Sequence, residues 1–220
     1  MKKILGASLA VILAFAAVGC SSSKFKTTRA RLKNNAEKAL GASEASKKQK
    51  NAMEKDDTEL TDSIFKNGCY LSYDADDAKE QDFGLKALKE GGCTGAFALI
   101  KSESESESFM LCQCIELDDK DLAGSVYDEI YDNLVIDAKD IKEAKKNIKD
   151  LEYGTDEQEG YMYTVLVLSD SKNMASGVYL KLDDNMVTAV AFKGEVKSDL
   201  YEEYLDFMFN SKLQDMEALL

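Results

Sequence analysis

Two pairs of apolar runs, each pair joined by a short polar stretch, most constrain how this chain can fold. The first pair occupies residues 94–101 and 108–116, and the second occupies residues 177–182 and 186–193. A Ser-Glu repeat separates the first two runs, and Asp-Asp-Asn separates the second two. Apolar runs of this length, bounded by turn residues, favour strands, and strands joined by such turns pair in antiparallel fashion. The chain is therefore expected to build an antiparallel sheet.

Helices are expected around these strands. Apolar residues recur at helical spacing up to residue 134, after Asp118 and Asp119 as capping residues, and a last helix is expected from Ser198 to Leu213. Weaker patterns predict further helices over 59–66, 82–90 and 138–151 and further strands over 69–73 and 161–168. This order predicts an α+β fold: an antiparallel sheet with helices packed on one face. The blocks 69–134 and 160–213 repeat the order strands-then-helix, without residue-level identity.

Charge divides the chain into a basic and an acidic part. Residues 21–57 hold ten basic and five acidic side chains, whereas residues 58–220 hold 16 and 36, a net charge of −20. The basic part has few large apolar residues, so we expect a solvent-exposed helical stalk over about 28–56. Fully helical, this stalk would reach about 45 Å. It would act either as a spacer attracted to anionic lipid or as a plain solvated linker.

Residue types that are absent exclude several functions. The chain has no His, which excludes a Ser-His-Asp triad, a Cys-His dyad and the H-E-x-x-H zinc site. The acidity of residues 58–220 argues against nucleic acid as a partner, because phosphate binding needs a basic face. Apolar residues make up 45% of the chain, enough for a packed core.

The first 23 residues have the pattern of an export signal. Met1-Lys2-Lys3 is a basic start, and Ile4–Ala17 is an apolar run too short to span a bilayer. Gly19, Cys20 and a run of serines follow. A small residue directly before a cysteine leaves the backbone accessible for cleavage, and a thiol is a strong nucleophile for alkylation.

This segment resembles the signal of bacterial lipoproteins, although Ala17 stands where most members carry Leu. The resemblance implies cleavage between Gly19 and Cys20, and a diacylglyceryl group on the Cys20 thiol. Two or three acyl chains would then anchor the protein stably at the extracytoplasmic face of the cell membrane, or at the outer membrane of a Gram-negative host. An ordinary signal peptide, cut near Ala17, is the alternative. The expected organisation is a signal peptide (1–19), a lipidated tether with the stalk (20–57) and an acidic domain (58–220).

Four further cysteines leave three interpretations open: Cys69, Cys93, Cys112 and Cys114. They can be buried free thiols, two disulfides, or a redox or metal site. Cys112 and Cys114 lie two apart on a predicted strand and should share one face. A hairpin centred on Glu105 puts Cys93 near Leu117, and a slip of a few residues would bring it beside Cys114. Cys93–Cys114 with Cys69–Cys112 is therefore the preferred pairing if disulfides form.

The acidic body offers no specific motif for catalysis. Asp74–Lys79 begins like a calcium loop but has Lys79 where the turn needs glycine, so calcium is not expected. The body resembles uncharacterised small lipoproteins of low-GC Gram-positive bacteria, which implies no particular activity. We therefore expect a non-enzymatic module, without a metal or cofactor, that binds an extracellular protein, peptide or small ligand. A thiol redox or metal-handling module using Cys112 and Cys114, or a carboxylate-based hydrolase, are the alternatives.

Overall fold

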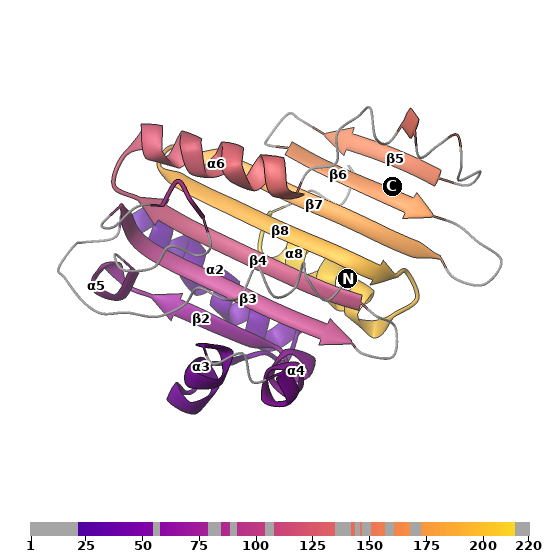
Figure 1. Cartoon of the computed structure of the whole chain (residues 1–220), viewed down its shortest axis with the longest axis horizontal. Helices are drawn as coiled ribbons and strands as arrows, with labels where there is room; N and C mark the ends of the chain where they lie inside the picture. Colours follow the sequence, from indigo (N-terminus) through magenta and orange to yellow (C-terminus); the bar gives the residue numbers. More distant parts are fainter. Residues whose placement is uncertain are drawn as a thin grey trace.

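An eight-stranded sheet forms the centre of the computed structural model (Figure 1). The residues that the structure describes are 22–54, 58–78, 85–88, 92–103, 108–134, 142–143, 146, 151–156, 161–167 and 173–213. The strands are β1 (Ser43–Glu44), β2 (Cys69–Tyr73), β3 (Cys93–Glu103), β4 (Ser108–Leu117), β5 (Leu151–Asp156), β6 (Tyr161–Val167), β7 (Met174–Asp183) and β8 (Met186–Glu195). Their order in the sheet is β1-β2-β3-β4-β8-β7-β6-β5, and all neighbours are antiparallel except β1 with β2. The α+β fold class with an antiparallel sheet is thus confirmed.

Helices cover both faces of this sheet, whereas the sequence suggested helices on one face. The helices are α2 (Ser23–Ala39), α3 (Lys47–Glu54), α4 (Thr58–Asn67), α5 (Ala75–Ala78), α6 (Lys120–Leu134) and α8 (Asp199–Asn210). In Figure 1, α6 lies in front of the sheet, and α2 and α8 lie behind it. Residues of α3, α4 and α5 share the apolar cluster of α6, and residues of α2 and α8 form the second cluster.

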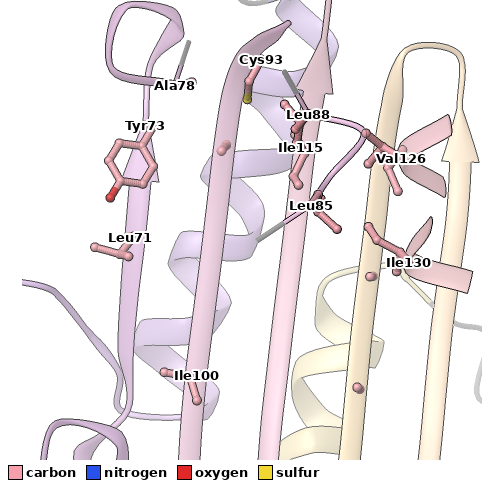
Figure 2. Close-up of a cluster of buried hydrophobic side chains, with 14 of the residues drawn as sticks. Leu71, Tyr73, Ala78, Leu85, Leu88, Cys93, Ile100, Ile115, Val126 and Ile130 are labelled. Atoms are coloured by element: carbon pink, nitrogen blue, oxygen red, sulfur yellow. The ribbon is translucent and has the colours of Figure 1, made fainter. Parts of the chain in front are cut away.

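Strand alternation explains why two helix layers are needed. Along β3, Phe97 and Leu99 point into the α2/α8 cluster, whereas Ile100 belongs to the α6 cluster. Both sets are almost fully buried. Figure 2 shows the α6 cluster, where Leu71, Ile100 and Ile115 from three strands share one face with Val126 and Ile130 of α6. A sheet with two apolar faces must be covered on both sides, because each exposed face would leave apolar surface in water.

Several predicted elements match the structure, and others do not. The six strands predicted between residues 69 and 193 correspond to β2, β3, β4, β6, β7 and β8. Ser198 caps α8, since its Oγ accepts the Tyr201 N–H at 3.2 Å. β5 was not predicted from the sequence, and residues 85–88 form a turn where a helix was expected. Most of the helix expected over 138–151 and the Ser-Glu tip at 104–107 lie outside the described residues.

The N-terminal helix packs on the sheet and is not an exposed stalk. α2 begins at Ser23 and ends at Ala39, and Phe25, Leu32 and Ala36 along it are fully buried. These residues form one narrow apolar stripe along the helix, flanked by basic residues. The composition of this segment did not reveal the stripe, because it contains few large apolar residues. The region after α2 is not a continuation of it, because Gly41 has φ +62°, which breaks the helix.

The suggested pseudo-repeat holds for the strands alone. Strands β2-β3-β4 and β6-β7-β8 are three-stranded meanders that meet side by side at the β4–β8 pair. The helices that follow them lie on opposite faces, since α6 belongs to one apolar cluster and α8 to the other. A two-fold axis that relates antiparallel β4 to β8 is perpendicular to the sheet, so it would leave each helix on the same face. Because α6 and α8 lie on opposite faces, this axis does not relate them.

Candidate functional site

A groove of about 410 Å³ runs between the first turns of α2, the hairpin end of β7 and β8, and the segment that follows α8. It lies on the face of the sheet that α2 and α8 cover. Its lining residues are Ser23, Lys24, Thr27, Thr28, Arg31, Tyr179, Lys181, Asp183, Met186, Thr188, Lys212 and Leu213. Cavities of this volume hold small organic ligands.

Regular secondary structure places the side chains of the groove. Lys181 and Asp183 are two apart on β7, and their register partners on β8 are Thr188 and Met186. All four therefore share one face of the sheet. On α2, the lining residues recur at helical spacing, so they form a polar stripe beside the buried apolar stripe of the same helix. The groove is thus walled by one helix face and floored by one strand pair.

Positive charge dominates the groove, although the whole chain carries −13. Four of its side chains are basic and one, Asp183, is acidic. Lys24 pairs with Asp183 at 2.7 Å between Nζ and Oδ1, and both side chains are substantially exposed. Such an exposed pair contributes about 0–1 kcal/mol and can rearrange when a ligand enters. Among the described residues, no carboxylate pairs with Arg31 or Lys212.

Arg31 lines the groove and carries a buried hydrogen-bond donor without a partner in the described part of the chain. Its Nε is buried and has no hydrogen-bond partner among the described residues. A buried donor left unpaired costs about 1–3 kcal/mol. A guanidinium presents its N–H donors in a fixed planar fork that suits carboxylate and phosphate oxygens. Nε itself is closed to a ligand in the groove, but Arg31 is partly exposed there, so its charge attracts an anionic acceptor.

Lys212 adopts a backbone conformation that favours glycine. Its φ is +53°, in the left-handed region. It follows the α8 C-cap, and Leu213 N donates to Met208 O at 3.1 Å while Lys212 N donates to Phe209 O at 3.0 Å. This pair of bonds is the Schellman motif, in which glycine commonly takes the position that Lys212 occupies. A lysine here costs about 1 kcal/mol of backbone strain, and it places a cation in the groove.

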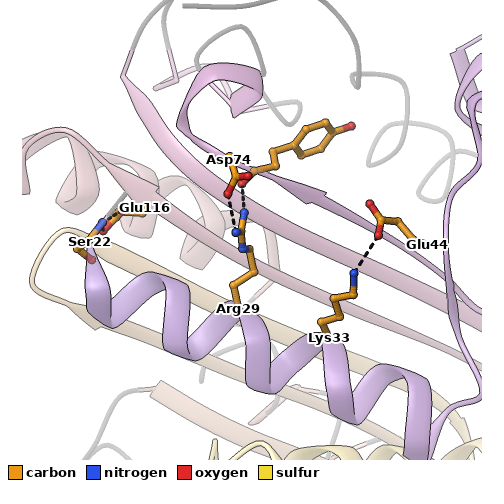
Figure 3. A network of polar contacts seen from close by, with 7 residues as sticks. Ser22, Arg29, Lys33, Glu44, Asp74 and Glu116 are labelled. Atoms are coloured by element: carbon orange, nitrogen blue, oxygen red, sulfur yellow. Dashed lines mark hydrogen bonds and ion pairs between the residues drawn. The ribbon is translucent and has the colours of Figure 1, made fainter. Parts of the chain in front are cut away.

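The N-terminus of α2 is already occupied by a carboxylate from the sheet. Ser22 N donates to both oxygens of Glu116 at 3.1 Å, and Thr94 Oγ1 donates to Glu116 Oε2 at 3.2 Å. Glu116 is 2% exposed. Figure 3 shows this contact at the start of α2, with the pairs Arg29–Asp74 and Lys33–Glu44 farther along the helix. The helix dipole is thus compensated internally, and the groove depends on side chains.

The four cysteines after Cys20 are free and buried. Cys69 and Cys93 belong to the cluster around α6, whereas Cys112 and Cys114 belong to the cluster around α2 and α8. The pairing Cys93–Cys114 with Cys69–Cys112 would have to cross the sheet, so this expectation is wrong. Its physical reason is a bulge between Cys93 and Gly95, which puts Cys93 opposite Leu117 and on the α6 face, whereas Cys112 and Cys114 lie on the other face.

Burial also makes these thiols poor nucleophiles. Burial raises the pKa of Cys93 and of Cys114 to about 12, and it raises the pKa of Cys69 to about 11. For Cys114, a hydrogen bond from Thr188 and the charge of Arg31 act in the opposite direction but do not prevail. Cys112 and Cys114 lie on one face, as their spacing predicts, but both are 0% exposed. Reactive cysteines are accessible and have a lowered pKa.

The acidic residues that resemble a calcium loop in the sequence form an ion pair and a short helix. Asp74 pairs with Arg29, and Ala75–Ala78 forms α5 in place of an open calcium loop. Among the described residues, no three His, Cys, Asp or Glu side chains are grouped so that they could hold a metal ion. The groove presents Asp183 as its single carboxylate, whereas glycoside-type hydrolysis uses a pair.

Cys20 and Gly19 lie outside the described residues, which begin two positions after Cys20. Within the described part of the chain, no helix has the length and apolar character needed to cross a bilayer.

Sequence reasoning missed the groove because Lys24 and Arg31 were counted as part of an exposed basic segment. A usable signal was present, since Lys24, Thr27, Thr28 and Arg31 follow the spacing of one helix face next to Phe25 and Leu32.

Searches against models of protein families, against curated proteins and against solved structures find no match for this chain.

Proposed function

We propose that this chain is a lipid-anchored extracytoplasmic protein that binds a ligand in the groove beside α2 and performs no catalysis on it. The signal-like segment before Cys20 supports the anchor. The observation that carries the proposal is the position of the groove, whose first lining residue, Ser23, comes three positions after Cys20. The anchor and the binding site therefore belong to the same end of α2.

The short connection sets the distance between the membrane and the groove. An extended chain advances at most about 3.6 Å per residue, so the three steps from Cys20 to Ser23 span at most about 11 Å. The packing of α2 on the sheet removes the long spacer that the sequence suggested. A lipidated Cys20 would hold the groove beside the headgroups of its own membrane.

The composition of the groove supports a small or extended anionic ligand. Arg31 and Lys212 supply charge, and the Thr28 hydroxyl supplies a neutral hydrogen bond. Tyr179, Met186 and Leu213 add apolar contact area beside them. Nucleic acid is a poor candidate, because the surrounding protein is strongly acidic.

Replacing Cys20 tests the anchor. The Cys20→Ser variant should lose the acyl groups, and it should be released from membranes or remain unprocessed. Ser21→Ala is the matched control, and it should fractionate with membranes as the wild type does. The measurements are detergent phase partitioning and the N-terminal mass of the mature protein. A wild-type N-terminus without acyl groups, with unchanged fractionation of Cys20→Ser, would disprove the anchor.

A further inference from the structure

We propose that the groove is a binding site for a small organic phosphate, either a soluble phosphate ester or the phosphate headgroup of a membrane lipid. This inference rests on the proposed function, because it names the ligand class for the same groove. The ligand has two parts in this assignment. Its phosphate lies among Arg31, Lys212 and the Thr28 hydroxyl, and its organic part lies against Tyr179, Met186 and Leu213.

The donor set favours phosphate over other anions. Arg31 is partly exposed where it lines the groove, and a guanidinium fork matches two oxygens of a phosphate. Lys212 adds a second cation from the opposite wall, which comes after α8. The Thr28 hydroxyl on α2 lies in the same space, whereas the hydroxyls of Thr27 and Thr188 donate to Ser23 O and Cys114 Sγ. A phosphate has enough oxygens to accept from Arg31, Lys212 and Thr28 together, whereas a single carboxylate has two.

The chain retains Lys212 at a position where glycine would be less strained. Its backbone lies in the left-handed region that the α8 cap requires. Strained positions of this kind cluster at sites that hold ligands. The α8 cap accounts for the backbone conformation, and Lys212 adds a positive charge to the groove where glycine would add none.

The groove is larger than inorganic phosphate alone would fill. About 410 Å³ is the size of a site for a small organic molecule. Glycerol 3-phosphate is a suitable probe, because it has the glycerol–phosphate bond of a glycerophospholipid, although in phosphatidylglycerol the phosphate is a diester. The position of Ser23 near Cys20 places a headgroup of the anchoring membrane within reach of the groove.

The first test measures binding of glycerol 3-phosphate to the mature lipidated protein in neutral detergent, by isothermal titration calorimetry. Arg31→Gln should weaken binding at least tenfold. Lys212→Gly should weaken it by about threefold or more and should leave folding intact, because glycine suits the left-handed position. Lys26→Gln is the matched control: it removes one cation from an exposed position of α2 outside the groove and should change affinity by less than twofold.

The second test separates the two sources of phosphate. The protein is placed in vesicles of an uncharged galactolipid, which has no phosphate, with and without phosphatidylglycerol, and hydrogen exchange is followed over residues 24–31. Protection caused by phosphatidylglycerol, and lost in Arg31→Gln, assigns a lipid headgroup. Protection caused by added glycerol 3-phosphate in both kinds of vesicle, with none from phosphatidylglycerol alone, assigns a soluble ester.

Three outcomes would overturn the assignment. If Lys26→Gln weakens binding as much as Arg31→Gln does, the attraction is general and the groove is not the site. If succinate binds as tightly as glycerol 3-phosphate, the groove binds anions but does not select phosphate, and the proposed binding function stands. If neither glycerol 3-phosphate nor succinate binds, while the Cys20→Ser variant is still released from membranes, the groove assignment fails and only the lipid anchor remains.

Discussion

Gly95 shows at the scale of one residue why α2 can lie flat on the sheet. A Cβ built on Gly95 would lie 2.4 Å from Cε1 and 2.8 Å from Cδ1 of Phe25. The Phe25 ring therefore takes the space that a side chain on β3 would occupy. Phe25 is 0% exposed, so its ring cannot turn away into solvent without losing its burial.

Adding a methyl group at this position should destabilise the protein. We expect Gly95→Ala to lower the free energy of unfolding by about 1–3 kcal/mol, because the overpacked ring or the backbone must shift. Urea denaturation followed by circular dichroism measures this change.

Gly124 in α6 provides the matched control. A Cβ there would meet nothing within 4 Å, so Gly124→Ala should raise stability by up to about 1 kcal/mol through helix propensity. Equal effects of the two substitutions would contradict the close packing of Phe25 on Gly95.

The helix that differs most from its sequence-based prediction is α2, which was expected to be an exposed stalk. Its polar face is held by contacts with segments far along the chain, including Arg29 with Asp74 and with Tyr73 O at 2.8 Å (Figure 3). At its other end, Asn35 Nδ2 donates to Ser211 Oγ at 3.1 Å, which joins α2 to the end of α8. A helix with these long-range partners folds with the domain and cannot act as an independent spacer.

Glu116 should contribute more to the stability of α2 than an exposed carboxylate does. Glu116→Gln removes a negative charge from the N-terminus of the helix and presents an amide group to the Ser22 N–H. We expect unfolding to become easier by about 1–3 kcal/mol, with faster amide hydrogen exchange in the first turns of α2.

Glu44→Gln is the control for this substitution. Glu44 accepts a hydrogen bond from Lys33 Nζ at 3.0 Å with both side chains exposed, so the loss should stay below about 1 kcal/mol. A Glu116→Gln variant as stable as Glu44→Gln would show that the contact with Ser22 does not hold the helix.

At the scale of the whole molecule, two apolar faces share one sheet, and buried ionisable groups lie on both. Burial raises the pKa of Cys93 on the α6 side and of Cys114 on the α2 side to about 12, from an ordinary value of 9.0. Burial also raises the pKa of Tyr204 on α8. Unfolding would release all of these groups into water at once, so their titration is linked to the stability of the whole fold.

Stability should therefore fall in alkaline solution. Below about pH 9 these thiols are protonated in both states, and they add no pH dependence. Between about pH 9 and pH 12 the unfolded chain loses protons that the folded protein keeps, so the free energy of unfolding decreases as pH rises. Each fully buried thiol contributes up to about 1.4 kcal/mol per pH unit.

Urea denaturation at pH 8 and pH 10.5 measures this decline. Cys93→Ala removes one titrating group, so the decline should be smaller in that variant. A free energy of unfolding that is the same at both pH values in the wild type would contradict the burial of the thiols.

The sequence was sufficient for the local features of this protein. Strands β3, β4, β7 and β8 follow from apolar runs with turns between them, because their pairing partners are close along the chain. The caps at Asp119 and Ser198 follow from side chains that bond to backbone groups within three residues, as Asp119 Oδ1 does with Leu122 N at 2.8 Å. The signal-like start ending at Cys20 is also a local pattern.

Tertiary structure alone decided where α2 lies, which faces the helices cover and where the cysteine side chains point. Phe25 meets Gly95, and Ser22 meets Glu116, across about 70 to 94 residues of sequence. A bulge between Cys93 and Gly95 put Cys93 on the opposite face from Cys112 and Cys114. The groove follows from the same packing, because it joins a stripe of α2 to β7, β8 and the end of α8. Propensity and periodicity describe neighbours in sequence, whereas these contacts depend on the space that distant side chains leave open.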